Sequence, residues 1–475
     1  MPGLSLYQAG FCHIGMACCF DVLKMNKMTK SDIIIIGAGP GGYETAILAA
    51  EKGKSVVIIE SSQLGGTCLN EGCIPTKSLC RSAEILQEIK EAAEFGVRDV
   101  RYSFDFPAAM QRKNSVVAQL RSGVEILLGH KLITVVYGKA LFKSPTVIEV
   151  GEEEYTASDI IIATGSYAFV PDIPGIGLSG VMTSREILSM EEMPESLCII
   201  GAGVIGLEFA SIMNSFGCKV TVLEYCRDIL PRFDTDIAKR LKQSLVKRGI
   251  SIVNSARVQS LSASGSGISV QYELKGKTET IEAEKVLAAI GRRARLDSMN
   301  FSDVGIALTP KGVQVDENMR TSVPHIYAVG DITGGFMLAH EAAAQGRRAL
   351  CDICGDSDRT DLSLIPAAVF TSPEAACVGL TEQQCTDSGI ECHCRKSFFR
   401  ANGKAVCLGQ TEGFCKIVVE GKQGEDGRIL GCHLFGPHSA DLIQEMTALI
   451  SKKAVLSDLD SLIHPHPTLS EIYIS

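Results

Sequence analysis

The stretch SDIIIIGAGPGGYETAILAAEKGKSVVIIE, residues 31–60, decides the fold of this chain. An apolar, β-rich run is followed by a glycine-rich turn and by the small-residue periodicity of a helix, and a second apolar run ends in Glu60. The order strand, turn, helix, strand predicts the βαβ beginning of a doubly wound sheet. We therefore expect an α/β fold.

The turn in this stretch has the spacing G-x-G-x-x-G, formed by Gly37, Gly39 and Gly42. Such glycines permit a tight turn and let the backbone approach a pyrophosphate at the N-terminus of the helix. Glu60, at the end of the second strand, can accept hydrogen bonds from both hydroxyls of an adenosine ribose. Because strand, turn, helix, strand and terminal acid all agree, the pattern predicts a dinucleotide site rather than a purely structural turn.

The same pattern returns further along the chain. Gly201, Gly203 and Gly206 follow a second apolar strand, and Glu224 ends the strand after it. Two dinucleotide sites are therefore predicted in one chain. A terminal glutamate repels a 2′-phosphate and binds a free 2′-hydroxyl, which favours NAD over NADP at the unit that holds the nicotinamide.

The composition is that of a globular protein with several domains. The chain has 475 residues, of which 45% are hydrophobic and 21% charged, and its formal net charge is −9. Neither a basic stripe nor an apolar run long enough to span a bilayer is visible, so we expect neither a nucleic-acid partner nor a membrane association. The 18 cysteines need not form a disulfide scaffold in a chain this long, and a reducing, cytoplasmic location fits them.

Residues 1–27 lack the features of a targeting segment. They have no basic start followed by a clear apolar block, and they are not rich in arginine. Met25 and Met28 stand just before the first predicted strand. We expect residues 1–27 to be an N-terminal extension that arises from a misplaced start site.

The segment GGTCLNEGCIPTK, residues 65–77, places Cys68 and Cys73 five positions apart at the start of a predicted helix. In a regular helix such positions lie about 8.6 Å apart, beyond the roughly 4.4–6.8 Å that a disulfide tolerates. Gly72 and Pro75 could supply the distorted turn that a bridge needs. A helix N-terminus also lowers a thiol pKa, as a redox-active thiolate requires. Two inert buried thiols are the less favoured interpretation, and we expect no metal site.

The C-terminal segment LIHPHPTLSEIYIS contains His464 and His466, and Glu471 stands five residues after the second. A histidine held by flanking prolines and braced by a carboxylate is a good general base, because the acid fixes its tautomer and stabilises its cation. A surface loop or a frayed tail can have the same sequence.

Cys351 and Cys354 form C-x-x-C, but without a second pair at zinc-like spacing they are more typical of ordinary helix residues.

Together, these motifs resemble the flavin disulfide reductases, and within them the branch that acts on lipoamide. The resemblance spans nearly all of residues 31–475, and the C-x-x-x-x-C segment is its most specific part. It implies two Rossmann-like dinucleotide-binding domains, for FAD and NAD, and a C-terminal α+β dimerisation domain. The implied segments are 28–155 (FAD-binding, with the redox disulfide), 156–288 (NAD-binding), 289–362 (a central domain that completes the FAD site) and 363–475 (dimerisation).

The resemblance also implies roles for individual residues. The implied FAD contacts are Gly37, Gly39, Gly42, Glu60, Gly66, Thr67, Lys77, Gly138, Thr164, Gly165, Ser166, Asp331, Met337, Leu338, Ala339 and His340. The implied NAD contacts are Gly201, Gly203, Val204, Ile205, Gly206, Glu208, Glu224, Val258 and Gly291. The implied catalytic residues are Cys68, Cys73, Lys77, Glu208, His466 and Glu471, with Lys77 and Glu208 paired beside the flavin. One departure from the family pattern is the segment GRRAR, residues 291–295, where GRRPN is usual.

The implied activity is the oxidation of protein-bound dihydrolipoamide to lipoamide with reduction of NAD. The implied partners are a second copy of the chain and the lipoyl domains and acyltransferase core of a 2-oxo acid dehydrogenase complex, or a lipoylated carrier protein. Two alternatives stay open: a reductase acting on another thiol or disulfide, and a mainly structural component of such a complex.

Overall fold

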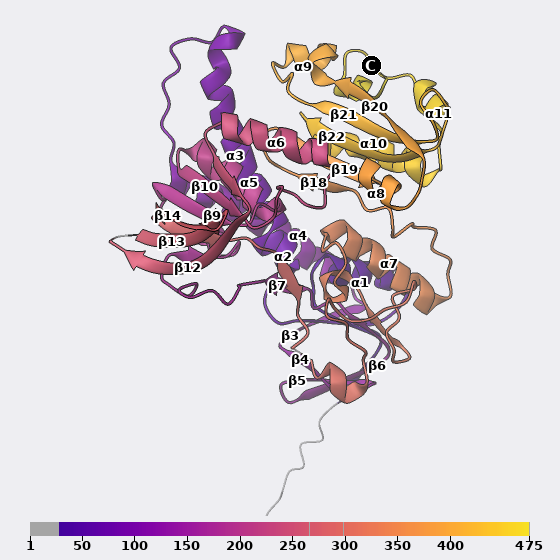
Figure 1. The fold of residues 1–475 in the computed structure, drawn as a ribbon. Helices are drawn as coiled ribbons and strands as arrows, with labels where there is room; N and C mark the ends of the chain where they lie inside the picture. The colour runs from indigo at the N-terminus through magenta and orange to yellow at the C-terminus, as the bar shows by residue number, and fades with distance from the viewer. Residues whose placement is uncertain (1–27, 266, 298, 475) are drawn as a thin grey trace, which may run out of the picture.

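The computed structural model describes residues 28–474, except residues 266 and 298 (Figure 1). The predicted N-terminal extension, residues 1–27, lies outside the described residues. Figure 1 shows one α/β region at the bottom, a second at the left and a C-terminal region at the upper right. Long helices run between the three regions.

The first βαβ unit consists of β1 (Thr29–Ile36), α1 (Pro40–Glu51) and β2 (Val56–Glu60). Strand β1 pairs in parallel with β2 on one side and with β6 (Glu153–Ile162) on the other. It lies at the centre of the sheet, where both faces are covered, and this explains its unbroken run of isoleucines. The other strands of this sheet are β3 (Ile133–Tyr137), β4 (Ala140–Ser144), β5 (Val147–Val150) and β17 (Ile326–Ala328).

Five helices surround this first sheet or extend from it. They are α1, α2 (Gly66–Glu71), α3 (Cys73–Glu91), α4 (Phe106–Leu128) and α7 (Ala339–Cys354). Helix α7 packs on α1, although about 290 residues separate the two in sequence, so the segment after β17 completes this region. Within residues 28–474, no helix is both long and apolar enough to cross a membrane. The short 3₁₀ helices here are η1 (Ala92–Phe95), η3 (Phe301–Val304) and η4 (Gly330–Thr333).

The second βαβ unit repeats the first. Strand β9 (Ser196–Ile200), helix α5 (Val204–Phe216) and strand β10 (Lys219–Glu224) lie in an all-parallel sheet of order β11-β10-β9-β15-β8. The remaining elements are β8 (Val181–Met182), β11 (Ser251–Asn254), β15 (Lys285–Ala288), α6 (Thr235–Lys247), η2 (Ile187–Ser189) and the antiparallel sheet of β12 (Ala256–Ser264), β13 (Gly267–Leu274) and β14 (Lys277–Ala283).

A two-stranded ribbon of β7 (Ser166–Ala168) and β16 (Arg292–Ala294) stands between the two units. Strand β6 of the first sheet runs across position 155, where the sequence suggested a domain boundary. A boundary inside a strand would divide its hydrogen bonds between two domains, so we place the end of the first segment after Ile162. The predicted end of the second segment coincides with the end of β15.

The C-terminal region is an antiparallel sheet of order β18-β19-β22-β21-β20 with α10 (Ser439–Ser451) packed on one face. The predicted fold class, two Rossmann-like units followed by an α+β domain, is confirmed. The elements of this domain are β18 (Ala367–Val369), β19 (Glu374–Gly379), β20 (Cys392–Phe398), β21 (Phe414–Glu420), β22 (Ile429–Gly436), α8 (Glu382–Asp387), η5 (Phe399–Ala401), α9 (Gly403–Cys407), α11 (Leu456–Asp460) and η6 (Leu469–Tyr473).

Candidate active site

The two glycine-rich turns have nearly the same backbone geometry. Gly37 and Gly201 adopt φ values of 104° and 106°, a left-handed conformation that favours glycine. A Cβ on Gly42 or Gly206 would lie 1.9 or 2.1 Å from the carbonyl oxygen of the first glycine in its own turn. These third glycines do not line the cavity described below. Their absent side chains let each helix pack against its own turn, and the cofactor contact suggested by the sequence at these two glycines stays a prediction.

The two glutamates at the strand ends are also held alike. Glu60 accepts backbone N–H bonds from Ala38 and Ser62 at 2.8 and 2.7 Å. Glu224 accepts two such bonds within its own unit, at 2.5 and 2.7 Å. Each carboxylate is thereby fixed at the mouth of its turn, and each oxygen keeps a further lone pair for a ribose hydroxyl.

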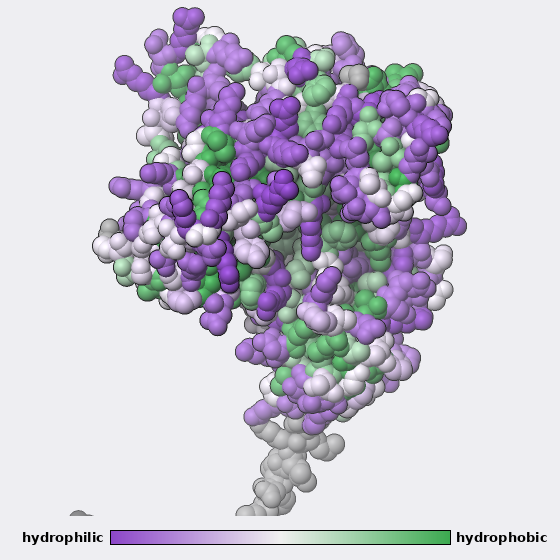
Figure 2. All heavy atoms as spheres, viewed as in Figure 1, coloured by the Kyte–Doolittle hydropathy of each residue, from purple (hydrophilic) through white to green (hydrophobic). Residues whose placement is uncertain are grey.

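A single large cavity of about 2770 Å³ connects the two units. In Figure 2, apolar side chains lie deepest in the hollow between the lower and upper parts of the molecule, while polar side chains cover most of the surrounding face. Of the predicted cofactor contacts, those that line the cavity are Gly37, Gly39, Glu60, Gly66, Thr67, Lys77, Gly138, Thr164, Gly165, Ser166, Gly201, Gly203, Val204, Ile205, Glu208, Glu224, Val258, Gly291, Asp331, Met337, Leu338, Ala339 and His340.

The cysteine pair lies at a break between two helices that both line this cavity. Helix α2 ends at Glu71, Gly72 adopts the irregular angles φ −146° and ψ −107°, and α3 begins at Cys73. The distorted turn expected from the sequence is therefore present. The side chains of Cys68 and Cys73 are hydrogen-bonded to each other, and both thiols are free in this structure.

The environment divides the charge unequally between the two thiols. The hydrogen bond from Cys68, aided by the positive charge of Lys77, lowers the pKa of Cys73 to about 7. The same hydrogen bond and burial raise the pKa of Cys68. With both thiols free, Cys73 is therefore the one of the two that loses its proton first, and Cys68 keeps its proton.

Lys77 continues α3 toward the second unit and pairs with Glu208 of α5. The lysine Nζ donates to both carboxylate oxygens at 2.9 Å. Glu208 is buried and also accepts the backbone N–H of Phe370 at 3.0 Å, while the Phe370 ring lies 4.2 Å below the lysine Nζ. Phe370 was missed in the sequence, because nothing near it in the chain resembles a site.

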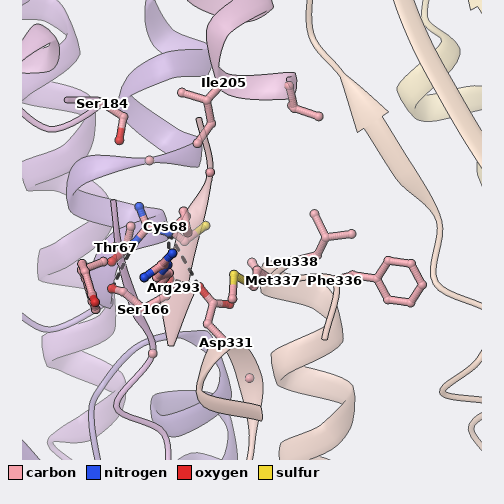
Figure 3. Close-up of a pocket in the computed structure, with 18 of the residues that line it drawn as sticks. Thr67, Cys68, Ser166, Ser184, Ile205, Arg293, Asp331, Phe336, Met337 and Leu338 are labelled. Carbon is pink, nitrogen blue, oxygen red and sulfur yellow. Dashed lines mark hydrogen bonds and ion pairs between the residues drawn. The ribbon is translucent and has the colours of Figure 1, made fainter. Parts of the chain in front are cut away.

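A second polar cluster lines the same cavity as the cysteines. Ser166 donates to Asp331 at 2.5 Å, and Arg292 donates from Nε to Ser166 at 2.7 Å. Figure 3 shows Thr67, Cys68, Ser166 and Asp331 around the same part of the cavity. Arg292 was not predicted as a site residue, although it follows Gly291 in the unusual GRRAR segment.

The cavity fits a dinucleotide with an extended middle section. It is lined by both glycine turns with their fixed glutamates, so each turn offers one dinucleotide site, and Asp331 lines it as well. The hydroxyl of Thr164 is buried there without a hydrogen-bond partner among the described residues. Because a buried hydroxyl without a partner is costly, this atom indicates a polar ligand such as FAD.

His466 and Glu471 form a hydrogen-bonded pair in the C-terminal domain. His466 Nδ1 lies 2.8 Å from Glu471 Oε1, and Glu471 Oε2 accepts the backbone N–H of Thr468 at 2.8 Å. The hydrogen bond from His466 holds the pKa of Glu471 below its ordinary value. The His466 side chain is 78% exposed, and neither residue lines the cavity of its own chain.

Comparison with known proteins now adds to the geometry. Residues 31–346 match the model of the pyridine nucleotide-disulphide oxidoreductases, and residues 365–474 match the dimerisation domain of the same name. The chain belongs to this family. It is an oxidoreductase whose cofactors are FAD and NAD, and its last domain is a dimerisation domain.

Within this family, curated proteins named dihydrolipoyl dehydrogenase are similar to the chain over most of its length. The chain is 39% identical to a dihydrolipoyl dehydrogenase of Geobacillus stearothermophilus, over 93% of this chain and 94% of that protein. It is 41% identical to one of Bacillus subtilis, over 93% and 96% of the two chains. Among solved structures, the HOCl-induced flavoprotein disulfide reductase RclA of Escherichia coli is similar, with a TM-score of 0.84, 32% identity and coverage of 93% of this chain and 98% of that chain.

Within the described residues, no group of three ligating side chains could hold a metal ion.

Proposed function

We propose that this protein oxidises dihydrolipoamide to lipoamide and reduces NAD, with Cys68 and Cys73 as its redox-active pair. The observation that carries the proposal is the pair itself: two contacting thiols at a helix break, on a dinucleotide cavity, with a lowered pKa at one of them. The curated relatives named dihydrolipoyl dehydrogenase support this choice of substrate.

The first half of the reaction is a thiol–disulfide exchange. A thiolate of dihydrolipoamide attacks Cys68 of the oxidised pair, a mixed disulfide forms, and Cys73 leaves as a thiolate. The second substrate thiolate attacks the substrate sulfur of the mixed disulfide, so that lipoamide is released and Cys68 becomes a thiol. Two electrons then reside on the cysteine pair. The lowered pKa of Cys73 makes it the better leaving group, which supports Cys68 as the sulfur that is attacked.

His466 accepts the substrate thiol proton, and Glu471 orients its imidazole and stabilises the resulting cation. The pair does not line the cavity of its own chain. We propose that it serves the cysteines of the second subunit in a homodimer, which the match to a dimerisation domain supports. The high exposure of His466 in one chain fits such a role.

Glu208 holds the ammonium group of Lys77, and so its positive charge, in one place beside Cys73.

The turn at Gly37 with Glu60 would hold the adenosine end of FAD, and Ser166 and Asp331 would hold its middle section. When bound, FAD would supply the two-electron redox chemistry that links the cysteine pair to NAD. The turn at Gly201 with Glu224 would hold NAD.

The partners proposed from the sequence are the lipoyl domains and the acyltransferase core of a 2-oxo acid dehydrogenase complex, or a lipoylated carrier protein. The names of the curated relatives support a lipoyl-bearing partner. We propose a cytoplasmic location, which the 18 cysteines support, since most of them have no role as a disulfide scaffold.

A steady-state assay tests the proposal. The purified protein is given dihydrolipoamide with NAD or NADP, and in parallel reduced glutathione with NAD. We expect turnover with dihydrolipoamide and NAD, and at least about tenfold lower kcat/KM with NADP, because Glu224 repels a 2′-phosphate. Turnover with glutathione but not with dihydrolipoamide would show that the enzyme acts on another thiol. Lack of turnover with either, in protein that retains its FAD, would favour a mainly structural component.

A further inference from the structure

The His466–Glu471 pair is built on a short turn near the end of the chain. Glu471 lies in η6, and one of its carboxylate oxygens is occupied by the backbone N–H of Thr468. The direction in which Glu471 faces His466 therefore depends on where the backbone of Thr468 lies. Whatever fixes the backbone at this residue also helps to fix the base.

Asn402, which belongs to a different element, fixes the backbone at Thr468. Its side-chain Nδ2 donates to the Thr468 carbonyl oxygen at 3.1 Å, while its Oδ1 accepts the N–H of Ala405 at 2.9 Å and caps helix α9. The residue is only 2% exposed. A buried amide is costly unless both its ends are bonded, and here both ends are satisfied by different parts of the chain.

The rest of the turn is anchored further along. Tyr473 donates its hydroxyl to Leu442 O at 2.6 Å, and Ser397 donates to the carbonyl oxygen of Ile472. These bonds hold the end of η6 against the core of the C-terminal domain. Asn402 acts at Thr468 itself, since it donates to the carbonyl oxygen of the residue whose backbone N–H Glu471 accepts.

We infer that Asn402 is a positioning residue for the His466–Glu471 base, acting through the backbone of Thr468. The inference rests on the proposed function, because it assumes that His466 takes the substrate thiol proton. It assigns to Asn402 a part in the half of the reaction in which dihydrolipoamide reduces the enzyme. The half in which NAD and the enzyme exchange electrons needs no base at His466 and should not depend on Asn402.

The test compares two reductants of the same protein, dihydrolipoamide and NADH. Oxidised, FAD-loaded enzyme is mixed in a stopped-flow instrument with dihydrolipoamide in one arm and with NADH in the other. In both arms the rise of the long-wavelength absorbance band, which a thiolate beside oxidised flavin gives in enzyme reduced by two electrons, is followed. The variant is Asn402→Ser, because serine is a good N-cap for α9 but its side chain is one bond shorter and leaves Thr468 without its donor. The matched control is Thr381→Ala, which removes the N-cap of α8 in the same domain.

For Asn402→Ser we expect reduction by dihydrolipoamide to be about tenfold slower, as small displacements of a catalytic group commonly produce, with the rate by NADH unchanged. Thr381→Ala should leave both rates at the wild-type value. Equal rates in Asn402→Ser and the wild type would overturn the inference, and so would an equal slowing in both arms. If Asn402→Ser does not fold, Asn402→Asp replaces it, since aspartate keeps the size and the capping oxygen without the Nδ2 donor. Wild-type enzyme that NADH reduces and dihydrolipoamide does not would overturn the proposed function, and the inference with it.

Discussion

Among the described residues, the cysteine pair Cys68–Cys73 and the cysteine pair Cys415–Cys432 have surroundings that differ in nearly every respect. Cys68 and Cys73 lie at a helix break, line the large cavity and have Lys77 beside them. Cys415 and Cys432 lie on the adjacent strands β21 and β22 with their sulfur atoms 3.7 Å apart, and both are 0% exposed.

The pKa directions follow these surroundings. In the first pair the pKa of Cys73 is lowered to about 7, whereas burial raises the pKa of Cys432 in the second pair well above its ordinary value. Thiol–disulfide exchange needs a thiolate and a path for the attacking sulfur. In both pairs the two sulfur atoms lie close together. What distinguishes a redox pair from two packed thiols is therefore a helix N-terminus, a nearby positive charge and access for the attacking sulfur.

The largest expected effect comes from the same substitution made in each pair. Cys68→Ala should lower turnover of dihydrolipoamide with NAD by at least about 10³-fold, because the attacked sulfur is gone, while FAD stays bound. Cys415→Ala should change turnover by less than about twofold. Both are measured by steady-state kinetics on protein whose flavin content is checked by absorbance. A large loss of turnover in Cys415→Ala that is fully folded and flavin-loaded would contradict the distinction.

A smaller effect is expected when only the cation of the first pair is removed. Lys77→Gln should raise the pKa of Cys73 above about 7, since a positive charge that favours the thiolate is lost. The rise should be about 1 on the pH scale, because the hydrogen bond from Cys68, the larger cause, is kept. The thiolate beside oxidised flavin gives a long-wavelength absorbance band, and its pH midpoint in enzyme reduced by two electrons measures this pKa.

The sign of that shift is the decisive part. The thiolate forms as the pH rises through the pKa, so the midpoint of the band should move to higher pH in Lys77→Gln. Lys90→Gln, at the far end of the same helix α3, should leave the midpoint unchanged. An unchanged midpoint in Lys77→Gln would show that the ammonium has no influence on the thiolate.

The helix break that carries the first pair could be predicted from the sequence, whereas the meeting of the second pair could not. The helix break at Gly72 and both glycine turns depend on residues close together in the chain, so their spacing reveals them. Cys415 and Cys432 meet only because of the register between β21 and β22, which local pattern does not specify. Arg292 and Phe370 were missed for the same reason, since each contacts site residues more than 100 positions away in sequence.

The pairing of Lys77 with Glu208 was expected only from resemblance to a family, and 131 positions separate the two residues. In the same way, Gly42 and Gly206 were identified as part of a binding motif, but only the close approach of each helix to its turn shows what their missing side chains allow. Sequence spacing therefore identifies turns more securely than it assigns contacts.

The smallest expected effect tests whether the second pair has a purely structural part. Cys432→Ala removes a fully buried sulfur from the core that also contains Tyr473 and Ile472. The lost packing should cost about 1–2 kcal/mol and lower the Tm by roughly 1–2 °C, while kcat stays within about twofold of the wild type. Differential scanning fluorimetry and the steady-state assay measure the two quantities. The helix η6 rests on this core. A selective loss of kcat without any fall in Tm would therefore mean that the buried pair influences the His466–Glu471 turn. In that case the two cysteine pairs would differ less in function than they differ in exposure.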